Sequence, residues 1–280
     1  MTRVLHLSDL HYGRERAGLE EALLSAIDRL DPDLVAISGD FTQRARVSQF
    51  ARARGFLDRL TQPWLAVPGN HDTPLDNLWV RMFAPWKRYR SAISPELEPR
   101  HETESMVVVG VNTVNRFAWQ RGRLSERRIE RACAGFAEAG ERARIVVLHH
   151  PLQHGPEVEK RLMRGAGAAL RRFADCGAQI VLSGHLHQTV VAPFRAHPGL
   201  LFVQAGTGLS DRLRGGERNT FNLLTLSGPR VSVETWGLEG EGFNLIGTKR
   251  YLRDGDRWER LPDAEAQAPE MVSTVRFPLV

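Results

Sequence analysis

The chain has 280 residues, 42% of them hydrophobic, which is enough for one large buried core with some decoration. Its net charge of +5 suits an anionic ligand, but much of the Arg excess is scattered on predicted helices and no basic motif with interleaved aromatic residues stands out, so no nucleic-acid partner is expected. The sequence has no apolar leader and no stretch of membrane-spanning length. A cytoplasmic protein without a transmembrane segment is therefore expected, and peripheral membrane contact is left open but not favoured.

Short apolar runs alternate with helical patterns through the first two-thirds of the chain. Strands are predicted over residues 4–8, 34–38, 64–67, 106–112, 145–148 and 179–183. Helices are predicted over about 17–30, 47–60, 125–138 and 157–173. Short all-apolar strands separated by helices indicate an α/β fold with a parallel or mixed sheet buried on both faces.

The pattern changes after Gly184, where strands follow one another without a helix between them. These strands are predicted over 189–193, 201–205, 220–226 and 230–236, and we expect them to form an antiparallel sheet that packs on the first. A catalytic domain is predicted over residues 1–236. Residues 237–280 are predicted as a C-terminal extension, in which 271–280 forms a final strand or an arm that contacts another subunit of a homo-oligomer.

The two cysteines, Cys133 and Cys176, have neither CxxC spacing nor a cluster of metal-ligating neighbours. We therefore expect two reduced and partly buried thiols.

Polar side chains follow five of the predicted strands at the point where each strand ends. The first polar residues are Asp9, Asp40, Asn70, His149 and His185. In open α/β sheets, ligands collect beyond the carboxyl ends of the strands, so these side chains are expected to face one crevice. Half of the ten His residues lie in the five clusters, and Asp, Asn and His are oxygen and nitrogen ligands of divalent metals.

The donor types predict two metal ions and an acid catalyst. A carboxylate can bridge two ions, and Asp40, on a tight turn after Gly39, is the best candidate for the bridge. A ligand set without thiolate favours Mn²⁺, Fe²⁺/Fe³⁺ or Zn²⁺. His71 lies between Asn70 and Asp72, and a neighbouring carboxylate could orient its ring for protonation of a leaving oxygen.

These clusters resemble the motifs of the calcineurin-like metallophosphoesterases. The blocks are Asp9-x-His11, Gly39-Asp40, Gly69-Asn70-His71-Asp72, His149 and Gly184-His185-x-His187, in that order. The chain is most similar to the bacterial class III cyclic-nucleotide phosphodiesterase branch, through residues 6–11, 67–72, 122–125, 205–207, Arg212-x-Arg214 and 219–222. The resemblance implies a four-layer α/β/β/α sandwich of two mixed β-sheets flanked by helices.

The resemblance also implies a division of the site residues. The implied ligands of one metal are Asp9, His11, Asp40 and His187, and those of the other are Asp40, Asn70, His149 and His185. His71 is implied as the acid that protonates the leaving group or stabilises the transition state, with Asp72 as its partner. The segment Gln43-Arg44-Ala45-Arg46 departs from the branch, which often has Gly a few residues after Gly-Asp.

Three functions are compatible with these residues. The first is hydrolysis of a small anionic phosphodiester, with a 3′,5′-cyclic nucleotide as the best substrate prediction. The second is cleavage of the pyrophosphate bond of a UDP-linked lipid precursor, and the third is an idle metallophosphoesterase fold that only binds.

Several polar or aromatic residues near the clusters have open roles. We expect His6 to be a satisfied sheet residue and His150 to lie behind the ligands, while His154 is either exposed or a substrate contact. Residues 78–90, with Phe117 and Trp119, could cap the site, but an amphipathic helix that buries its own aromatic residues is favoured.

Overall fold

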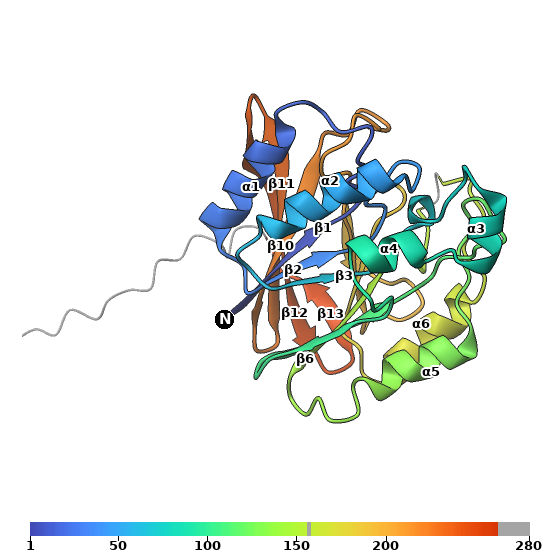
Figure 1. The fold of residues 1–280 in the computed structure, drawn as a ribbon. Coiled ribbons are helices and arrows are strands. Elements are labelled where there is room, and N and C mark those ends of the chain that lie inside the picture. The colour runs from blue at the N-terminus through green and yellow to red at the C-terminus, as the bar shows by residue number, and fades with distance from the viewer. Residues whose placement is uncertain (156–157, 263–280) are drawn as a thin grey trace, which may run out of the picture.

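The computed structural model describes residues 1–155 and 158–262, which form two β-sheets packed face to face between helices (Figure 1). The helices of these residues are α1 (Leu19–Leu30), α2 (Val47–Asp58), α3 (Leu78–Phe83), α4 (Lys87–Ala92), α5 (Glu126–Ala134) and α6 (Ala166–Asp175). None of the helices in these described ranges has the length and hydropathy needed to cross a bilayer.

The first sheet is mixed and has seven strands in the order β13-β12-β11-β10-β1-β2-β3. Their bounds are β1 (Thr2–Leu7), β2 (Leu34–Ile37), β3 (Trp64–Ala66), β10 (Thr220–Ser227), β11 (Arg230–Glu239), β12 (Gly242–Asp254) and β13 (Arg257–Arg260). Strands β1, β2 and β3 are parallel, whereas β10 pairs antiparallel with β1 and continues into an antiparallel ribbon through β13.

The second sheet is also mixed and has six strands in the order β4-β5-β6-β7-β9-β8. Their bounds are β4 (Arg100–Glu102), β5 (Met106–Val111), β6 (Ala143–Leu148), β7 (Ile180–Ser183), β8 (Val190–Pro193) and β9 (Leu201–Gln204). The four central strands are parallel, and the edge strands β4 and β8 are antiparallel to their neighbours.

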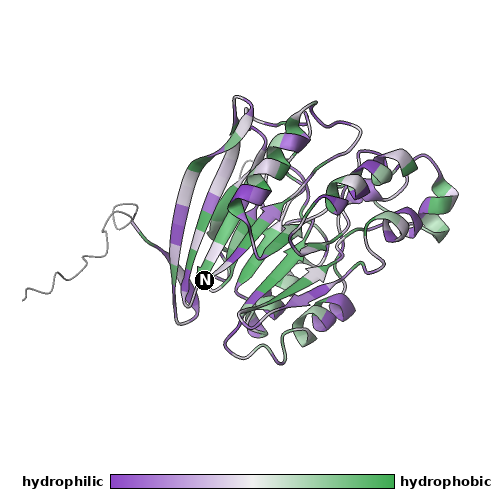
Figure 2. Cartoon of the chain, turned by 60° about the vertical axis from the view of Figure 1, so that its left-hand side comes forward, coloured by the Kyte–Doolittle hydropathy of each residue, from purple (hydrophilic) through white to green (hydrophobic). Residues whose placement is uncertain are grey.

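Three hydrophobic clusters hold four layers together. On β1, Leu5 and Leu7 pack outward against α1 and α2, whereas Val4 points into the cluster between the two sheets. This alternation is the period of two of a β-strand. A third cluster lies between the second sheet and the helices α5 and α6, and the apolar strands in the centre are visible in Figure 2. The predicted α/β/β/α sandwich is therefore confirmed.

The strands after Gly184 are arranged differently from the prediction. Strands β8 and β9 join the second sheet, and β9 pairs parallel with β7, while β10 to β13 extend the first sheet. The prediction of one separate antiparallel sheet was wrong, because strand order depends on pairings between distant segments. The register of β1 with β10, for example, joins Val4 to Leu224.

The predicted boundary at residue 236 lies inside β11, and the chain continues in the first sheet to Arg260 at the end of β13. The predicted strand or arm over 271–280 lies outside the described residues. The helix predicted over 157–173 begins at Ala166, after Gly165 with a φ of 85°. A Cβ on Gly165 would collide with the backbone carbonyl of Leu124, so the sharp turn into this helix requires glycine.

The prediction of two reduced thiols was wrong. Cys133 in α5 and Cys176, the residue after α6, form a disulfide with a Cα–Cα distance of 5.6 Å. The residues are 43 positions apart in the chain, so spacing alone gives no sign of the pair. The packing of α5 against α6 brings the two cysteines together.

Candidate metal centre

The backbone at the strand ends directs the predicted ligands toward one place. Among the described residues, seven other than glycine have a positive φ, and five of them are predicted ligands. These five are Asp9 (54°), His11 (49°), Asp40 (55°), His185 (74°) and His187 (59°). Such a backbone costs about 1–3 kcal/mol per residue and persists only where the surrounding structure enforces it, which is typical of functional sites.

Two glycines allow the loops after β2 and β3 to approach each other closely. A Cβ on Gly39, where φ is 92°, would lie 2.7 Å from the backbone nitrogen of Gly69. A Cβ on Gly69 would lie 2.7 Å from Cγ of Asp40. Glycine is therefore required at both positions if Asp40 and Asn70 are to reach the same site.

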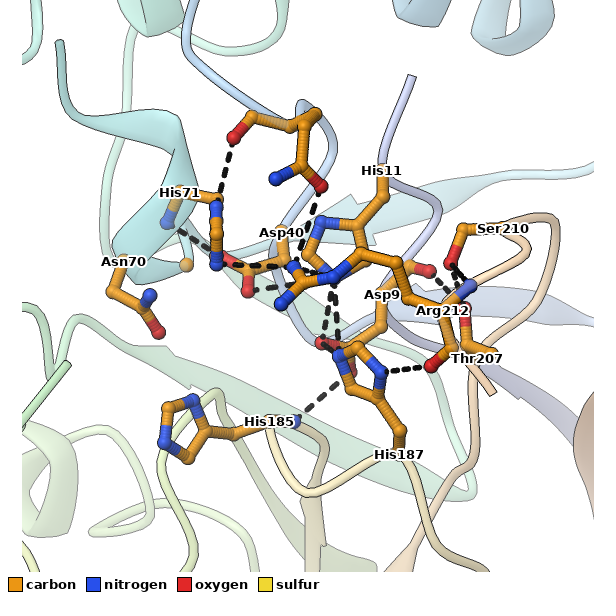
Figure 3. Close-up of polar contacts among 12 residues, drawn as sticks. Asp9, His11, Asp40, Asn70, His71, His185, His187, Thr207, Ser210 and Arg212 are labelled. Atoms are coloured by element: carbon orange, nitrogen blue, oxygen red, sulfur yellow. Dashed lines mark hydrogen bonds and ion pairs between the residues drawn. The ribbon is translucent and has the colours of Figure 1, made fainter. Parts of the chain in front are cut away.

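Asp9, His11 and His187 form the first group of ligand atoms (Figure 3). Oδ1 of Asp9 lies 3.4 Å from Nε2 of His11 and 3.1 Å from Nε2 of His187, and these two nitrogens are 3.1 Å apart. An ion at about 2.1 Å from each ligand, with angles of about 90–109°, places ligand atoms about 3.0–3.4 Å apart. The three atoms therefore have the spacing of ligands around one ion.

Asn70, His149 and His185 form the second group together with Asp40. Nε2 of His149 lies 3.1 Å from Oδ1 of Asn70, 3.3 Å from Nδ1 of His185 and 3.3 Å from Oδ2 of Asp40. These distances also fit one shared ion.

Asp40 joins the two groups. Its Oδ2 lies 3.8 Å from Nε2 of His11 in the first group and 3.3 Å from Nε2 of His149 in the second. Its Oδ1 accepts a hydrogen bond from the backbone N–H of His71, at 2.8 Å. The fixed oxygen leaves Oδ2 directed at both groups, which is the arrangement that a bridging carboxylate needs.

In Asp9, as in Asp40, one carboxylate oxygen is fixed by hydrogen bonds and the other faces the predicted ligands. Oδ2 accepts hydrogen bonds from Oγ of Ser8 at 2.6 Å and from the backbone N–H of His185 at 2.9 Å. Oδ1 is buried without a hydrogen-bond partner. A buried carboxylate oxygen without a partner costs free energy, so this atom fits a metal ligand.

Backbone carbonyls orient two of the ligand imidazoles. Nδ1–H of His149 donates to the carbonyl of Ser38, and Nδ1–H of His187 donates to the carbonyl of Arg212, each at 2.7 Å. A hydrogen bond at one ring nitrogen fixes the tautomer and leaves the other, Nε2, free to bind a metal.

The pKa values of most predicted ligands favour the protonation states that bind a metal cation. Burial favours the neutral acid, but the imidazoles around Asp9 outweigh it and hold its pKa well below the usual range. Burial lowers the pKa of His11 to about 4 and also lowers the pKa of His185. Burial opposes a charge on His149, but Asp40 raises the pKa of this ring to about 9. Metal ligation needs ionised carboxylates and neutral imidazoles, so His149 would have to lose a proton to bind an ion.

The predicted partnership of Asp72 with His71 is not present. The carboxylate of Asp72 accepts backbone N–H groups of Phe41, Thr42 and Gly69, at 2.9–3.2 Å. Burial and the charge of Asp40 raise the pKa of Asp72 to about 7, against the effect of these hydrogen bonds. Asp72 therefore holds the loops after β2 and β3 together, because it sits where their backbone N–H groups converge.

His71 is held instead by Gln43. Its Nδ1–H donates to the Gln43 carbonyl at 2.8 Å, and its Nε2 lies 3.1 Å from Nη1 of Arg212. Gln43 also accepts a hydrogen bond from Arg212 at 3.3 Å, through Oε1. The segment that departs from the family pattern therefore positions two polar groups at the site.

Arg212 is a site residue that was not predicted. Nη1 of Arg212 lies 3.4 Å from Nε2 of His11 as well as 3.1 Å from Nε2 of His71 (Figure 3). The Arg212-x-Arg214 block carried part of the family resemblance, but its spacing gave no sign that the loop folds back over the metal ligands.

The remaining imidazoles lie largely as expected. His6 is buried in β1 and its Nε2 contacts Oγ of Ser38 at 2.9 Å. His150 lies behind the ligands and is not itself free to bind, since Nδ1 contacts Thr113 Oγ1 and Nε2–H donates to the Gln120 carbonyl. His154, whose role was left open, contacts the carbonyl of Lys160 at 3.0 Å.

The segment after η1 (Asn70–Asp72) buries its aromatic residues only in part: Tyr89 of α4 is buried and Trp86 is half-buried, so the favoured prediction for residues 78–90 was wrong for α3 alone. In α3, the side chains of Leu78, Trp79 and Phe83 are exposed, whereas Arg81 is buried. The guanidinium of Arg81 fills the inner face because carbonyls of the following loops accept its hydrogen bonds.

A family model for calcineurin-like phosphoesterase matches residues 2–189, which is more than half of the chain. The matched range includes all seven predicted ligands and His71.

One curated relative matches part of the chain. Glycerophosphodiester phosphodiesterase GpdQ from Enterobacter lignolyticus (strain SCF1) is 24% identical over 163 residues, which are 52% of this chain and 55% of the relative. The chain therefore spans about half the length of this relative.

Two solved structures share the fold. Purple acid phosphatase PPD1 from yellow lupin (Lupinus luteus) has a TM-score of 0.64 at 14% identity, and the match covers 91% of this chain and 54% of that one. A dimetal phosphatase from Danio rerio has a TM-score of 0.63 at 13% identity, with 88% of this chain and 98% of that one covered. At these identities the likeness concerns the fold alone.

Proposed function

We propose that this chain, which belongs to the calcineurin-like phosphoesterase family of metal-dependent phosphohydrolases, hydrolyses a small phosphodiester at two metal ions. The observation that carries the proposal is Oδ2 of Asp40, which faces both groups of ligand atoms at 3.8 and 3.3 Å. Asp9, His11, Asp40 and His187 would hold one ion, and Asp40, Asn70, His149 and His185 the other. Ions of Mn²⁺, Fe²⁺/Fe³⁺ or Zn²⁺ suit these donors.

The chain's own groups prepare the phosphoryl group for attack. Two bound divalent ions supply Lewis-acid activation of water and of the phosphoryl oxygens. Asp40 and Asp9 would hold the ions through one carboxylate oxygen each, because the other oxygen of each is already fixed by hydrogen bonds. This preorganisation removes the need to reorient the ligands during the reaction.

His71 is the proposed general acid. The Gln43 carbonyl fixes Nδ1, and Nε2 faces Arg212 near the ligand atoms. Once Arg212 binds the phosphate instead of Nε2, the ring is free to be protonated, and Nε2–H then donates to the leaving oxygen as its bond to phosphorus breaks. Such proton transfer contributes about 10²–10⁴-fold to the rate.

Arg212 and Lys160 are the proposed anion contacts. Burial lowers the pKa of Arg212, and burial followed by the charges of Arg214 and Arg212 lowers the pKa of Lys160. These cations therefore share one partly buried environment with the metal ligands. A phosphodiester anion compensates such a group of positive charges.

The cavity beside His185 favours a small polar substituent on the phosphate. It has a volume of about 230 Å³, and its lining combines the polar side chains of Gln120, His154 and Lys160 with the apolar side chains of Pro151 and Met163. No Phe, Tyr or Trp is among its described lining residues, so none of these rings is present there to stack on a nucleobase. We therefore propose a diester of a small polar alcohol, the class to which the printed name of GpdQ also points.

A substrate panel tests this proposal. The Mn²⁺-loaded chain is assayed with glycerophosphodiesters, bis-p-nitrophenyl phosphate, cyclic AMP, cyclic GMP and a UDP-linked lipid, with an Asp40→Ala variant as control. We expect the highest kcat/KM for a glycerophosphodiester and no turnover by the variant. Preference for a cyclic nucleotide would contradict this proposal and support the substrate predicted from sequence. Preference for the UDP-linked lipid would support the pyrophosphatase. No turnover of any substrate would support a fold that only binds.

A further inference from the structure

An exposed apolar surface lies beside the site and has no role in the proposed reaction. We call it the α3 patch, and its members are Leu78, Trp79, Met82, Phe83, Phe117 and Trp119. Their exposed fractions range from 40% to 73%, and they make up six of the twelve exposed large hydrophobic residues of the described chain. A contiguous apolar surface of this kind marks an interaction site.

Arg81 joins the two segments that make up the α3 patch. Its guanidinium donates to Oγ1 of Thr73 at 2.7 Å and to the carbonyls of Arg116 and Ala118 at 2.8 Å each. These bonds tie α3 to the loop that carries Phe117. Arg81 occupies the inner face of the short helix, so the side chains opposite it point outward.

The two largest aromatic side chains of α3 are ordered without being buried. The rings of Trp79 and Phe83 stack with their centroids 4.5 Å apart and their planes 28° from parallel. They lie on adjacent turns, at i and i+4, on the face opposite Arg81. The patch therefore presents a fixed pair of apolar rings that insert into a partner without a large loss of side-chain entropy.

The surroundings of the patch are strongly basic. Beside the buried Arg81, residues 77–95 contain Lys87, Arg88 and Arg90 and no Asp or Glu, although Arg88 pairs with Asp76; residues 112–125 contain three Arg and no acidic residue. A depression of about 260 Å³ adjoins the patch and is lined by Trp86, Phe117, Arg116, Arg123 and Arg128 among others. It has the size and charge to receive a phosphate headgroup.

From this arrangement we propose that the α3 patch docks the protein on an anionic lipid bilayer, with the aromatic rings among the headgroups and the basic residues on lipid phosphates. Aromatic and aliphatic side chains next to Lys and Arg are the composition of interfacial membrane contacts. A second copy of this chain fits less well, because it would oppose the same positive charges. The sequence analysis did not favour peripheral membrane contact, because it considered only an apolar leader and stretches of membrane-spanning length; the exposed rings of α3 are a feature that the structure adds.

The docked orientation has a consequence for the site. Segment 77–92 follows the carboxyl end of β3, and the loop with Phe117 follows the carboxyl end of β5. The metal ligands lie at the same edge of the sheets, at the ends of β1, β2, β3, β6 and β7. Docking through the α3 patch therefore turns the edge of the sandwich that carries the site toward the bilayer.

Cosedimentation with vesicles tests the proposal on the full chain. We expect binding to vesicles of phosphatidylglycerol and phosphatidylcholine in equal amounts, weaker binding at high salt, and little binding to phosphatidylcholine alone. Trp79→Ser/Phe83→Ser should weaken binding at least about tenfold, since each ring offers about 150–250 Å² of surface. Lys87→Gln/Arg90→Gln should weaken it about fivefold per charge.

Controls separate docking from folding and from the chemistry. Leu245→Ser/Ile246→Ser removes two exposed apolar residues of β12 and should leave vesicle binding unchanged. Turnover of a soluble diester and the thermal unfolding curve should be the same in wild type and in Trp79→Ser/Phe83→Ser.

Three results would overturn the proposal. The first is equal vesicle binding by wild type and Trp79→Ser/Phe83→Ser. The second is a wild-type dimer that this variant converts to a monomer, without vesicle binding, which would make the patch a contact between copies. The third is binding of a single-stranded oligonucleotide, but not of vesicles, that the same variant abolishes.

Discussion

His71 bonds to its own chain through Nδ1 and faces Arg212 through Nε2, so its side chain is not needed to hold an ion. We predict that His71→Ala retains both metals and lowers kcat by about 10²–10⁴-fold. Metal content by elemental analysis and kcat on a diester with a poor leaving group measure the two effects. His197→Ala, on the turn between β8 and β9 at the opposite edge of the sheet, is the control. Loss of metal from His71→Ala would make His71 a ligand and contradict the role given to it.

The backbone carbonyl of Arg212 orients His187 in the candidate metal centre, and the guanidinium of Arg212 faces His11 and His71. Because the carbonyl that accepts from His187 is backbone, Arg212→Ala should keep the metals. A charge-assisted hydrogen bond to a phosphoryl oxygen is worth about 1.5–3 kcal/mol, so kcat/KM should fall by roughly 10–100-fold. Arg195→Ala, an exposed position in the turn between β8 and β9, should leave kcat/KM unchanged. An unchanged kcat/KM in Arg212→Ala would exclude the contact.

At the scale of elements, the loops after β2 and β3 meet only because Gly69 has no side chain. In Gly69→Ala, the new Cβ would lie 2.7 Å from Cγ of Asp40. We predict a loss of about 1–3 kcal/mol in the free energy of unfolding, as for other overpacked sites, together with weaker metal binding. Gly55→Ala in α2 is the matched control, since a Cβ there meets nothing within 4 Å and should stabilise the helix by about 0.5–1 kcal/mol. Equal stability of Gly69→Ala and wild type would show that the loops can move apart.

The disulfide between α5 and the end of α6 gives a second prediction at this scale. Thiol titration of the unfolded, unreduced chain should find no free cysteine, and reduction should lower the free energy of unfolding by about 3–4 kcal/mol. Cys133→Ser/Cys176→Ser should unfold at the same temperature with and without reductant. Two reactive thiols before reduction would contradict the disulfide and agree with the reduced cysteines predicted from sequence. Disulfides are typical of oxidising compartments, so this one argues against the cytoplasmic location that the sequence predicts. That location stays a prediction.

The sequence predicted those elements and residues whose patterns are local. Strands such as β5 and β6 follow from short apolar runs, and the ligands follow from polar residues at strand ends. The pairing of β1 with β10 and the entry of β9 into the second sheet depend on contacts between distant segments, which local patterns do not carry. The position of Arg212 and the buried guanidinium of Arg81 were missed for the same reason, since distant carbonyls and imidazoles surround them.

At the scale of the whole molecule, the two sheets meet with the carboxyl ends of their parallel strands at one edge. The first sheet contributes Asp9, Asp40 and Asn70 from the loops after β1, β2 and β3, while the second contributes His149 and His185 from those after β6 and β7. The site therefore exists only when both sheets have packed together. The bridging role that we propose for Asp40 depends on this geometry, because its loop lies where the two sheets join.

Anomalous diffraction from crystals of the Mn²⁺-loaded protein tests the shared carboxylate most directly. We predict two anomalous peaks about 3.5–4 Å apart, with Oδ2 of Asp40 between them. One peak should be ligated by Asp9, His11 and His187, and the other by Asn70, His149 and His185. A single peak, or two peaks that do not share Asp40, would contradict the account.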